Sequence, residues 1–188
     1  APAFGDLDGD GDLDLVVGGW GGRLYYYENV GSTASPSYAA GSASLFGGIE
    51  VGGGSKPALA DLDGDGDLDL VVGGDDSGLL YFENVGSAAS PTYAAVTGSA
   101  NPFDGIDVGW SSKPWFGDVD GDGDLDLVVG NYDYFINYYE NVGSAASPSY
   151  AAVTGTASPF DGIDVGYSPA PALVDLDGDG DLDLVVGE

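Results

Sequence analysis

Aspartate occupies every second position in four nine-residue segments of this sequence. Segment 6–14 reads Asp-Leu-Asp-Gly-Asp-Gly-Asp-Leu-Asp, and the same five Asp recur at 61–69, 118–126 and 175–183. Five carboxylates within nine residues repel one another unless a cation lies among them. Carboxylate oxygens select a hard cation, and calcium accepts roughly six to eight of them in flexible geometry, whereas magnesium demands a tight octahedron. Each segment therefore predicts a calcium loop.

Glycine stands at the sixth position of every loop (Gly11, Gly66, Gly123, Gly180). It permits the sharp turn that curls a loop around an ion, as the sixth-position glycine of an EF-hand does. An EF-hand itself is excluded, because it needs a bidentate Glu at position twelve and two flanking helices. Position twelve is valine in all four loops, and Gly and Pro interrupt every short stretch, which disfavours helices.

The rest of the composition narrows the chemistry. The 188 residues contain no Cys and no His, which excludes disulfides, thiolate zinc sites and a Cys nucleophile, and removes the commonest general base. Three Lys and Arg stand against 32 Asp and Glu, so the net charge is −29. Nucleic acids and anionic membranes attract basic residues, and we expect neither nucleic-acid binding nor membrane insertion. Without a nucleophile and base in combination, we expect no enzyme.

The Asp loops belong to a longer repeat, because their first residues lie 55, 57 and 57 positions apart. Leu-Val-Val-Gly follows every loop, and Glu-Asn-Val-Gly-Ser recurs three times downstream. We divide the chain into units 1–54, 55–111 and 112–168 and a half-unit 169–188. The first unit departs from the other two near its end, where Leu-Phe-Gly-Gly-Ile-Glu-Val-Gly replaces Pro-Phe-Asp-Gly-Ile-Asp-Val-Gly.

Short β-rich runs bounded by turn residues must hold these loops. In the second unit we expect strands at Pro57–Leu62, Leu68–Val72, Leu79–Asn84 and near Tyr93–Val96, and a further extended piece around Ile106–Val108. Four antiparallel strands per unit predict an all-β fold of propeller-type blades, three complete and a terminal half-blade. A β-solenoid is the structural alternative, although its coils are usually much shorter than these units.

The loop between two short strands resembles the calcium loop of integrin α-chain propellers, and the whole unit resembles the FG-GAP/VCBS repeats of secreted microbial proteins. The resemblance covers essentially the entire chain. It implies about four calcium ions with a structural role, and side-chain ligands at positions 1, 3, 5 and 9 with a backbone carbonyl at position 7. The implied side-chain ligands are Asp6, Asp8, Asp10, Asp14, Asp61, Asp63, Asp65, Asp69, Asp118, Asp120, Asp122, Asp126, Asp175, Asp177, Asp179 and Asp183. The implied carbonyl donors are Asp12, Asp67, Asp124 and Asp181.

Aromatic residues that differ between the units mark a second kind of candidate surface. Trp20 and Tyr132 follow the second strand of their units, Trp110 and Tyr167 lie between blades, and Trp115 replaces an alanine. Exposed rings on a rigid loop suit sugar stacking or a protein contact. Packing between blades is the plainer interpretation, and the sequence leaves both open.

These features favour a calcium-stabilised extracellular scaffold that binds protein or carbohydrate without catalysis, by interaction or adhesion. One alternative is a structural subunit of a filament or larger assembly, joined through the half-blade by self-assembly. A lectin-like carbohydrate-binding module is the second alternative. Extracellular calcium modules typically bind calcium at about 10⁻⁴ to 10⁻³ M, so we expect a location outside the cell or on its surface.

Overall fold

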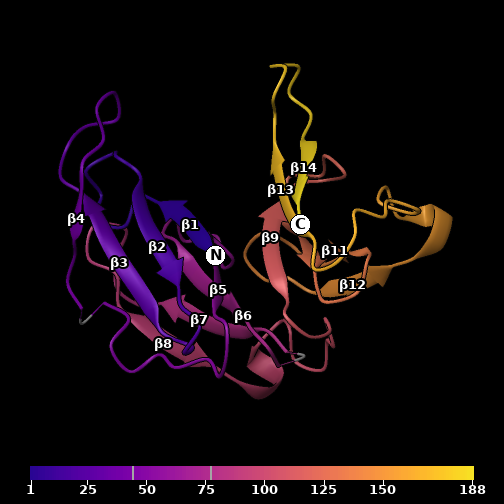
Figure 1. Cartoon of the computed structure of the whole chain (residues 1–188), viewed down its shortest axis with the longest axis horizontal. Helices are drawn as coiled ribbons and strands as arrows, with labels where there is room; N and C mark the ends of the chain where they lie inside the picture. The colour runs from indigo at the N-terminus through magenta and orange to yellow at the C-terminus, as the bar shows by residue number, and fades with distance from the viewer. Residues whose placement is uncertain (44, 77) are drawn as a thin grey trace.

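The computed structural model describes residues 1–43, 45–76 and 78–188, and it is built from antiparallel sheets (Figure 1). Within these residues, three sheets have four strands in chain order and a fourth sheet has two. The strands are β1 (Pro2–Gly5), β2 (Asp14–Gly18), β3 (Leu24–Asn29) and β4 (Tyr38–Ala40); β5 (Lys56–Ala60), β6 (Asp69–Gly73), β7 (Leu80–Asn84) and β8 (Tyr93–Val96); β9 (Lys113–Gly117), β10 (Asp126–Gly130), β11 (Ile136–Asn141) and β12 (Tyr150–Val153); and β13 (Ala170–Val174) and β14 (Asp183–Gly187). The prediction of four-stranded blades followed by a half-blade is confirmed.

The strand boundaries follow the backbone hydrogen bonds. β8 coincides with its prediction, and β5, β6 and β7 begin or end within two residues of theirs. The predicted extended piece at Ile106–Val108 is not assigned to any strand among the described residues. It serves packing instead: Val108 is 1% exposed and Phe103, just before it, is 2% exposed.

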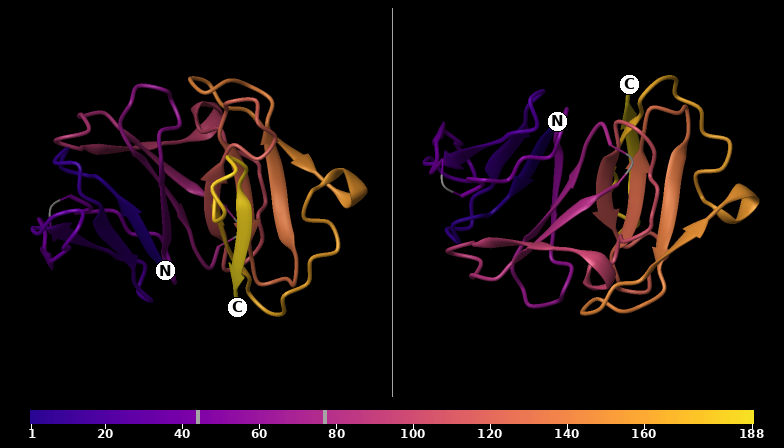
Figure 2. Two further views of the ribbon diagram at one scale, coloured as in Figure 1. Left: turned by 90° about the horizontal axis from the view of Figure 1, so that it is seen from above. Right: turned by 90° about the horizontal axis from the view of Figure 1, so that it is seen from below.

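The four sheets follow one another in an arc, with the N-terminal blade and the β13–β14 hairpin at its two ends (Figures 1 and 2). Their first strands lie innermost, with β1 beside β5, β5 beside β9 and β9 beside β13. We call the sheets blades one to three and the half-blade. Each of them falls inside one of the predicted units.

The core fills the spaces between neighbouring blades. The alternation of strand side chains sends the middle valine of Leu-Val-Val to one face and its two neighbours to the other. Val71 therefore packs with Leu127 of blade three, while Leu70 and Val72 pack with Val16 of blade one. Each blade is thus apolar on both faces, as a propeller requires.

Helical structure is confined to two short 3₁₀ turns, η1 (Gly98–Ala100) and η2 (Gly155–Ala157), in the part of the chain that the structure describes. No helix found there is long and apolar enough to cross a membrane.

Candidate metal centres

Each Asp loop joins the first two strands of a blade and turns back on itself at two glycines. In blade two these are Gly64 and Gly66, with φ of 75° and 94°, in the left-handed region that favours glycine. The first aspartate holds both: Gly64 N donates to Asp61 Oδ1 at 2.8 Å, and Gly66 N donates to Asp61 Oδ2 at 3.0 Å. The sharp turn expected at the sixth-position glycine is confirmed by this geometry.

The aspartates at loop positions 3 and 5 form successive side-chain turns. Asp63 Oδ1 accepts from the amide of Asp65 at 3.2 Å, and Asp65 Oδ1 accepts from the amide of Asp67 at 3.0 Å. These bonds aim the carboxylates into the loop. In the complete blades, ligand atoms of positions 1, 3 and 5 come within 4.8 Å of one another; in the half-blade, those of positions 1, 3 and 9 do so. The groups are Asp6, Asp8 and Asp10; Asp61, Asp63 and Asp65; Asp118, Asp120 and Asp122; and Asp175, Asp177 and Asp183.

The aspartate at loop position 9, called the ninth aspartate below, is buried in the complete blades, and its carboxylate is a hub that accepts several hydrogen bonds. Asp69 Oδ2 accepts from Leu62 N at 3.1 Å and from the Tyr81 hydroxyl at 3.0 Å, and Asp69 Oδ1 accepts from Asn84 N at 2.8 Å. A carboxylate has about four lone-pair sites, so three donors leave room for an ion on Oδ1. The role of position 9 as a ligand stays a prediction for these blades.

The half-blade shows what the third strand contributes to this hub. Asp183 Oδ2 accepts from Leu176 N at 3.0 Å, but no β3-type strand supplies the tyrosine and asparagine donors in the described structure. Asp183 is exposed, whereas Asp14, Asp69 and Asp126 are each 1% exposed. The freed carboxylate joins Asp175 and Asp177.

The aspartate at position 7 of the loop in blade two has a buried carboxylate oxygen that a bound cation would satisfy. Asp67 is 8% exposed, and its Oδ1 is buried without a hydrogen-bond partner among the described residues. A buried carboxylate oxygen without a partner is costly. Burial raises the pKa of Asp67, and the charges of Asp65 and Asp63 raise it further. A bound calcium ion would relieve both effects, and the all-oxygen donor set fits calcium.

The pKa values of other loop carboxyls are also raised, so their charged form is disfavoured. Burial raises the pKa of Asp69 to about 6 against three hydrogen bonds that lower it. Burial is also the first cause of the raised pKa of Asp8, Asp63 and Asp120, with neighbouring aspartates adding to it. One ion pair is present among the described residues, between Lys56 Nζ and Asp75 Oδ1 at 3.4 Å. Because Asp75 lies outside the Asp loops, no lysine or arginine of the described residues forms an ion pair with a loop carboxylate.

The tyrosine and asparagine that complete each hub were not predicted from the sequence. Tyr26, Tyr81 and Tyr138 donate to the ninth aspartates, and the side-chain Oδ1 of Asn84 accepts from Gly86 N and Thr92 N. The signal was present in the repeat, because the tyrosine and asparagine lie 12 and 15 residues after that aspartate in all three units. Constant separations of this kind predict a shared hydrogen-bond network.

Four of the variable aromatic residues, Trp20, Trp110, Tyr132 and Tyr167, lie at the strand ends opposite the Asp loops, whereas Trp115 lies within β9. Tyr167 contacts Tyr134 and Tyr132, with ring centroids 4.5 and 5.9 Å apart. Trp20 is 90% exposed and Trp110 is 70% exposed, so packing between blades does not account for these two rings.

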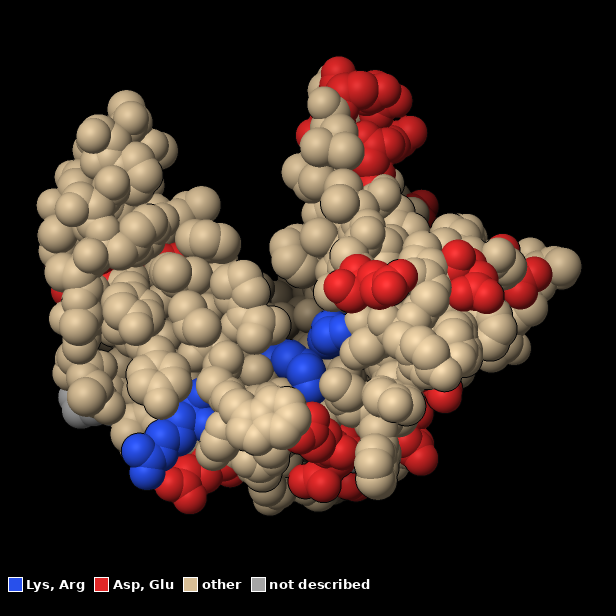
Figure 3. Space-filling view, in the orientation of Figure 1, with Lys and Arg blue, Asp and Glu red and all other residues tan. Residues whose placement is uncertain are grey.

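The central hollow is lined by the innermost strands and has a volume of about 480 Å³. Its lining includes Phe4, Trp115 and the two lysines Lys56 and Lys113. Lys113 Nζ donates to Ser168 Oγ at 2.8 Å and to the carbonyl of Pro169 at 3.2 Å, which ties β9 to the start of the half-blade. Figure 3 shows basic side chains beside the hollow and acidic side chains over the tip of the β13–β14 hairpin.

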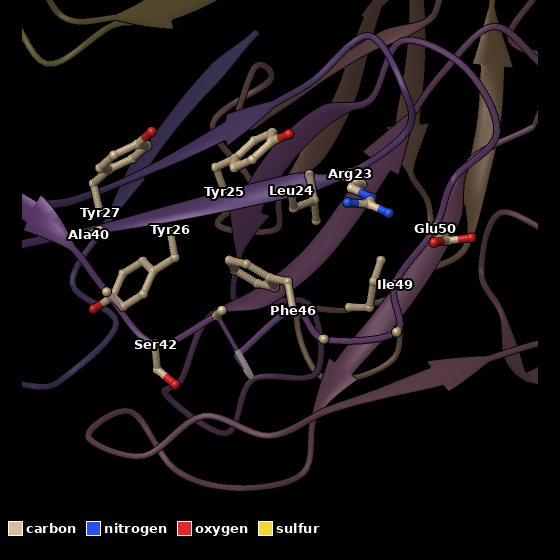
Figure 4. A pocket seen from close by; sticks show the side chains of 14 residues that line it. Arg23, Leu24, Tyr25, Tyr26, Tyr27, Ala40, Ser42, Phe46, Ile49 and Glu50 are labelled. Carbon is tan, nitrogen blue, oxygen red and sulfur yellow. The ribbon is translucent and has the colours of Figure 1, made fainter.

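A second cavity of about 450 Å³ lies at the outer side of blade one (Figure 4). The rings of Tyr26 and Phe46 meet edge to face in it, with centroids 6.4 Å apart. Arg23 and Glu50 supply the charged groups of its lining. The cavity offers apolar surface but no group of converging carboxylates, and it contributes nothing to the metal centres.

Three overlapping stretches, residues 6–72, 61–129 and 118–186, match the profile described as FG-GAP-like repeat. The chain belongs to the FG-GAP-like repeat family. This confirms the resemblance drawn from the loop and strand motifs. No curated protein sequence matches the chain.

Solved structures similar to this FG-GAP chain include two from very different proteins. An Agrocybe aegerita lectin, described as specifically recognising non-reducing terminal N-acetylglucosamine, matches with a TM-score of 0.58 and 21% identity, over 99% of this chain and 46% of its own. The Photorhabdus luminescens Tc holotoxin pore matches with a TM-score of 0.50 and 20% identity, over 98% of this chain and 8% of its own. The chain spans less than half the length of either. These likenesses show the propeller-like fold.

Proposed function

We propose that this FG-GAP chain is a calcium-stabilised, non-catalytic interaction scaffold that works outside the cell. The observation that carries the proposal is the geometry of the Asp loops. All four place three carboxylates within 4.8 Å of one another, and one loop buries an unpartnered carboxylate oxygen as well. Such an arrangement is unfavourable without a cation and favourable with one.

Calcium at these positions acts on the fold, because every loop connects the first two strands of a blade. In blade two the loop runs from β5 to β6, and its ninth aspartate is bonded to β7 through Asn84 N. An ion bound at the first, third and fifth aspartates therefore stabilises three strands together. About four ions would change the net charge from −29 to about −21, since −29 + 8 = −21.

The extracellular setting follows from the affinity expected of such loops. Calcium modules of the extracellular type bind at about 10⁻⁴ to 10⁻³ M, a concentration that the cell exterior supplies. Contacts with partners would use the exposed aromatic loops at the ends opposite the calcium loops, where Trp20 and Trp110 stand free.

Isothermal titration with calcium tests the proposal. We expect uptake of about four ions with affinities near 10⁻⁴ M. The double substitution Asp61→Asn and Asp65→Asn should remove about one of the four ions, since both residues lie in one carboxylate group. The matched control is Asp104→Asn, an exposed acid outside the loops, which should leave the stoichiometry unchanged. Absence of calcium uptake by the unmodified chain would refute the proposal.

A lectin-like role is a second candidate, supported by the tyrosine cluster of blade three. Tyr132, Tyr134 and Tyr167 gather on one surface and are 58%, 38% and 56% exposed. Rings in this arrangement suit stacking against a sugar face. The lectin of similar fold recognises terminal N-acetylglucosamine, which makes that sugar the first probe to use.

Titration of the calcium-loaded chain with N-acetylglucosamine tests the lectin-like role. Binding that Tyr167→Ala abolishes and Trp20→Ala preserves would support it. Equal binding by the two variants, or no binding at all, would exclude this cluster as a sugar site.

A further inference from the structure

The Asp loops of blades one and two have identical sequences but differ in the hydrogen bonding of position 7. Segments 6–14 and 61–69 contain the same nine residues. In blade one, the Thr33 hydroxyl donates to Asp12 Oδ1. In blade two, the equivalent oxygen, Asp67 Oδ1, is buried and has no hydrogen-bond partner among the described residues. The difference therefore comes from outside the loop.

The residue responsible lies in the turn that follows the third strand of each blade. Thr33 comes 21 residues after Asp12, and the residue at the same separation from Asp67 is Ala88. Alanine has no side-chain donor, so it cannot supply the missing hydrogen bond. Both turn residues are exposed, which means that packing in the core does not dictate either of them.

The two turns have the same backbone geometry. In each blade the fourth residue of the turn donates its amide to the carbonyl of the first at 2.9 Å, from Ser35 to Ser32 and from Ser90 to Ser87. The asparagine that ends the third strand holds both turns equally, because its Oδ1 accepts from a glycine N–H at 3.1 Å in each blade. A threonine in the second turn would therefore carry its hydroxyl beside position 7 of the loop, as in the first.

The carboxylate of Asp67 faces the other carboxylates of its loop. The charges of Asp65, Asp63 and Asp61 all raise its pKa, and these three residues form the carboxylate group within 4.8 Å. Blade two is flanked by blade one and blade three, so its loop lies in the interior of the row. A buried carboxylate oxygen without a partner is costly, and a cation held by its three neighbours would reduce that cost.

We propose that the side chain of Asp67, and not only its backbone carbonyl, takes part in calcium binding by blade two, whereas Thr33 withholds the side chain of Asp12 in blade one. The inference rests on the proposed calcium-binding function and adds that the loops are not equivalent. Calcium affinity depends on the number of charged ligands. An additional carboxylate therefore strengthens binding in blade two.

The calcium-free states of the two loops favour the same order. The Thr33 hydrogen bond stabilises the Asp12 carboxylate before calcium binds, and a cation must compete with that bond. Asp67 Oδ1 has no such bond to lose, and cation binding satisfies it. We therefore expect blade two to bind calcium roughly tenfold more tightly than blade one.

Nuclear magnetic resonance during a calcium titration tests the order of filling, because each loop has its own reporter amide. Gly11 N and Gly66 N donate to the first aspartate of their loops, both at 3.0 Å. The Gly66 signal should move at roughly tenfold lower calcium than the Gly11 signal. Simultaneous movement, or earlier movement of Gly11, would contradict the proposal.

Substitutions in the turn isolate the effect of the hydroxyl. Ala88→Thr should shift the Gly66 midpoint to roughly tenfold higher calcium, because the hydroxyl gives Asp67 a competing partner. Ala88→Val is the matched control, since valine is branched like threonine but has no donor, and it should leave the midpoint unchanged. In blade one, Thr33→Val should move the Gly11 midpoint to lower calcium. Circular dichroism checks that every variant folds.

Asp67→Asn tests the carboxylate directly, because it removes the charge and keeps the backbone carbonyl. The Gly66 midpoint should then rise at least to that of Gly11. A midpoint that neither Asp67→Asn nor Ala88→Thr changes would overturn the role of this side chain and leave calcium binding by the loops intact. Absence of a calcium response from every loop of the unmodified chain would refute the proposed function, and this inference with it.

Discussion

At the scale of single residues, the ninth aspartate of each complete blade links the Asp loop to the third strand. Asp69 receives three donors from two segments of its blade, and the tyrosine hydroxyl is the side-chain donor among them. Hydrogen bonds to a charged acceptor contribute more than neutral ones. The stability of a blade should therefore depend on this tyrosine more than on any exposed one.

We predict that Tyr81→Phe lowers the free energy of unfolding by about 1.5 to 3 kcal/mol, because a buried carboxylate loses one charged hydrogen bond. Urea denaturation in saturating calcium measures the change. Tyr25→Phe, at a half-exposed ring in blade one, is the control and should change the free energy by less than about 0.5 kcal/mol. Equal effects of the two substitutions would contradict the role of the hub.

The raised pKa of Asp69 predicts an unusual pH dependence for the calcium-free chain. Its pKa of about 6 lies above the unfolded value near 3.9, so the folded state binds the proton more tightly. This contribution to stability is complete below about pH 4 and is lost as the pH rises through 6.

Thermal melts in calcium-free buffer should accordingly show a higher Tm at pH 4.5 than at pH 7. Asp69→Asn should reduce this difference, because the titrating group is removed. Calcium needs ionised carboxylates, so its stabilising effect should grow over the same pH window. A calcium-free Tm that rises steadily from pH 4.5 to 7 would contradict the assignment.

At the scale of elements, the Asp loop is a turn fixed by glycine geometry and by its first aspartate. Gly66 has a φ of 94°, and an added Cβ would meet nothing within 4 Å, so substitution there tests the backbone alone. We predict that Gly66→Ala costs about 1 to 2 kcal/mol of stability and weakens calcium binding in that loop.

The control for this prediction is Gly78→Ala in the same blade, where a Cβ also has open space and the backbone is not left-handed. Denaturation and calcium titration of both variants measure the difference. A Gly66→Ala chain as stable as the control would show that the loop adapts without strain.

The presence of each strand could be predicted from the repeat. The residue at which a strand ends depends on whether its backbone N–H donates to a side chain or to the neighbouring strand. The predicted strand Pro57–Leu62 ends two residues early, at Ala60, because Leu62 N donates to the Asp69 carboxylate and not to a neighbouring strand. The Lys113 contacts with Ser168 and Pro169 join residues 55 and 56 positions apart, and no local pattern signals them. The carboxylate groups were predictable, because their spacing is local.

At the scale of the whole molecule, the chain is a row of blades whose boundaries are built from one repeated surface. The repetition explains why the central hollow and both terminal faces present apolar side chains such as Phe4 and Val185. It also distributes four Asp loops along the row, one to each blade and one to the half-blade. Calcium should therefore act on the stability of the entire chain and not on one local site.

Thermal unfolding of the full chain, in chelator and in millimolar calcium, tests this central claim most directly. Four sites with affinities near 10⁻⁴ to 10⁻³ M should raise Tm by about 3 to 20 °C, and magnesium at the same concentration should raise it much less. An unchanged Tm in calcium would contradict the claim that the Asp loops are calcium sites on which the fold depends.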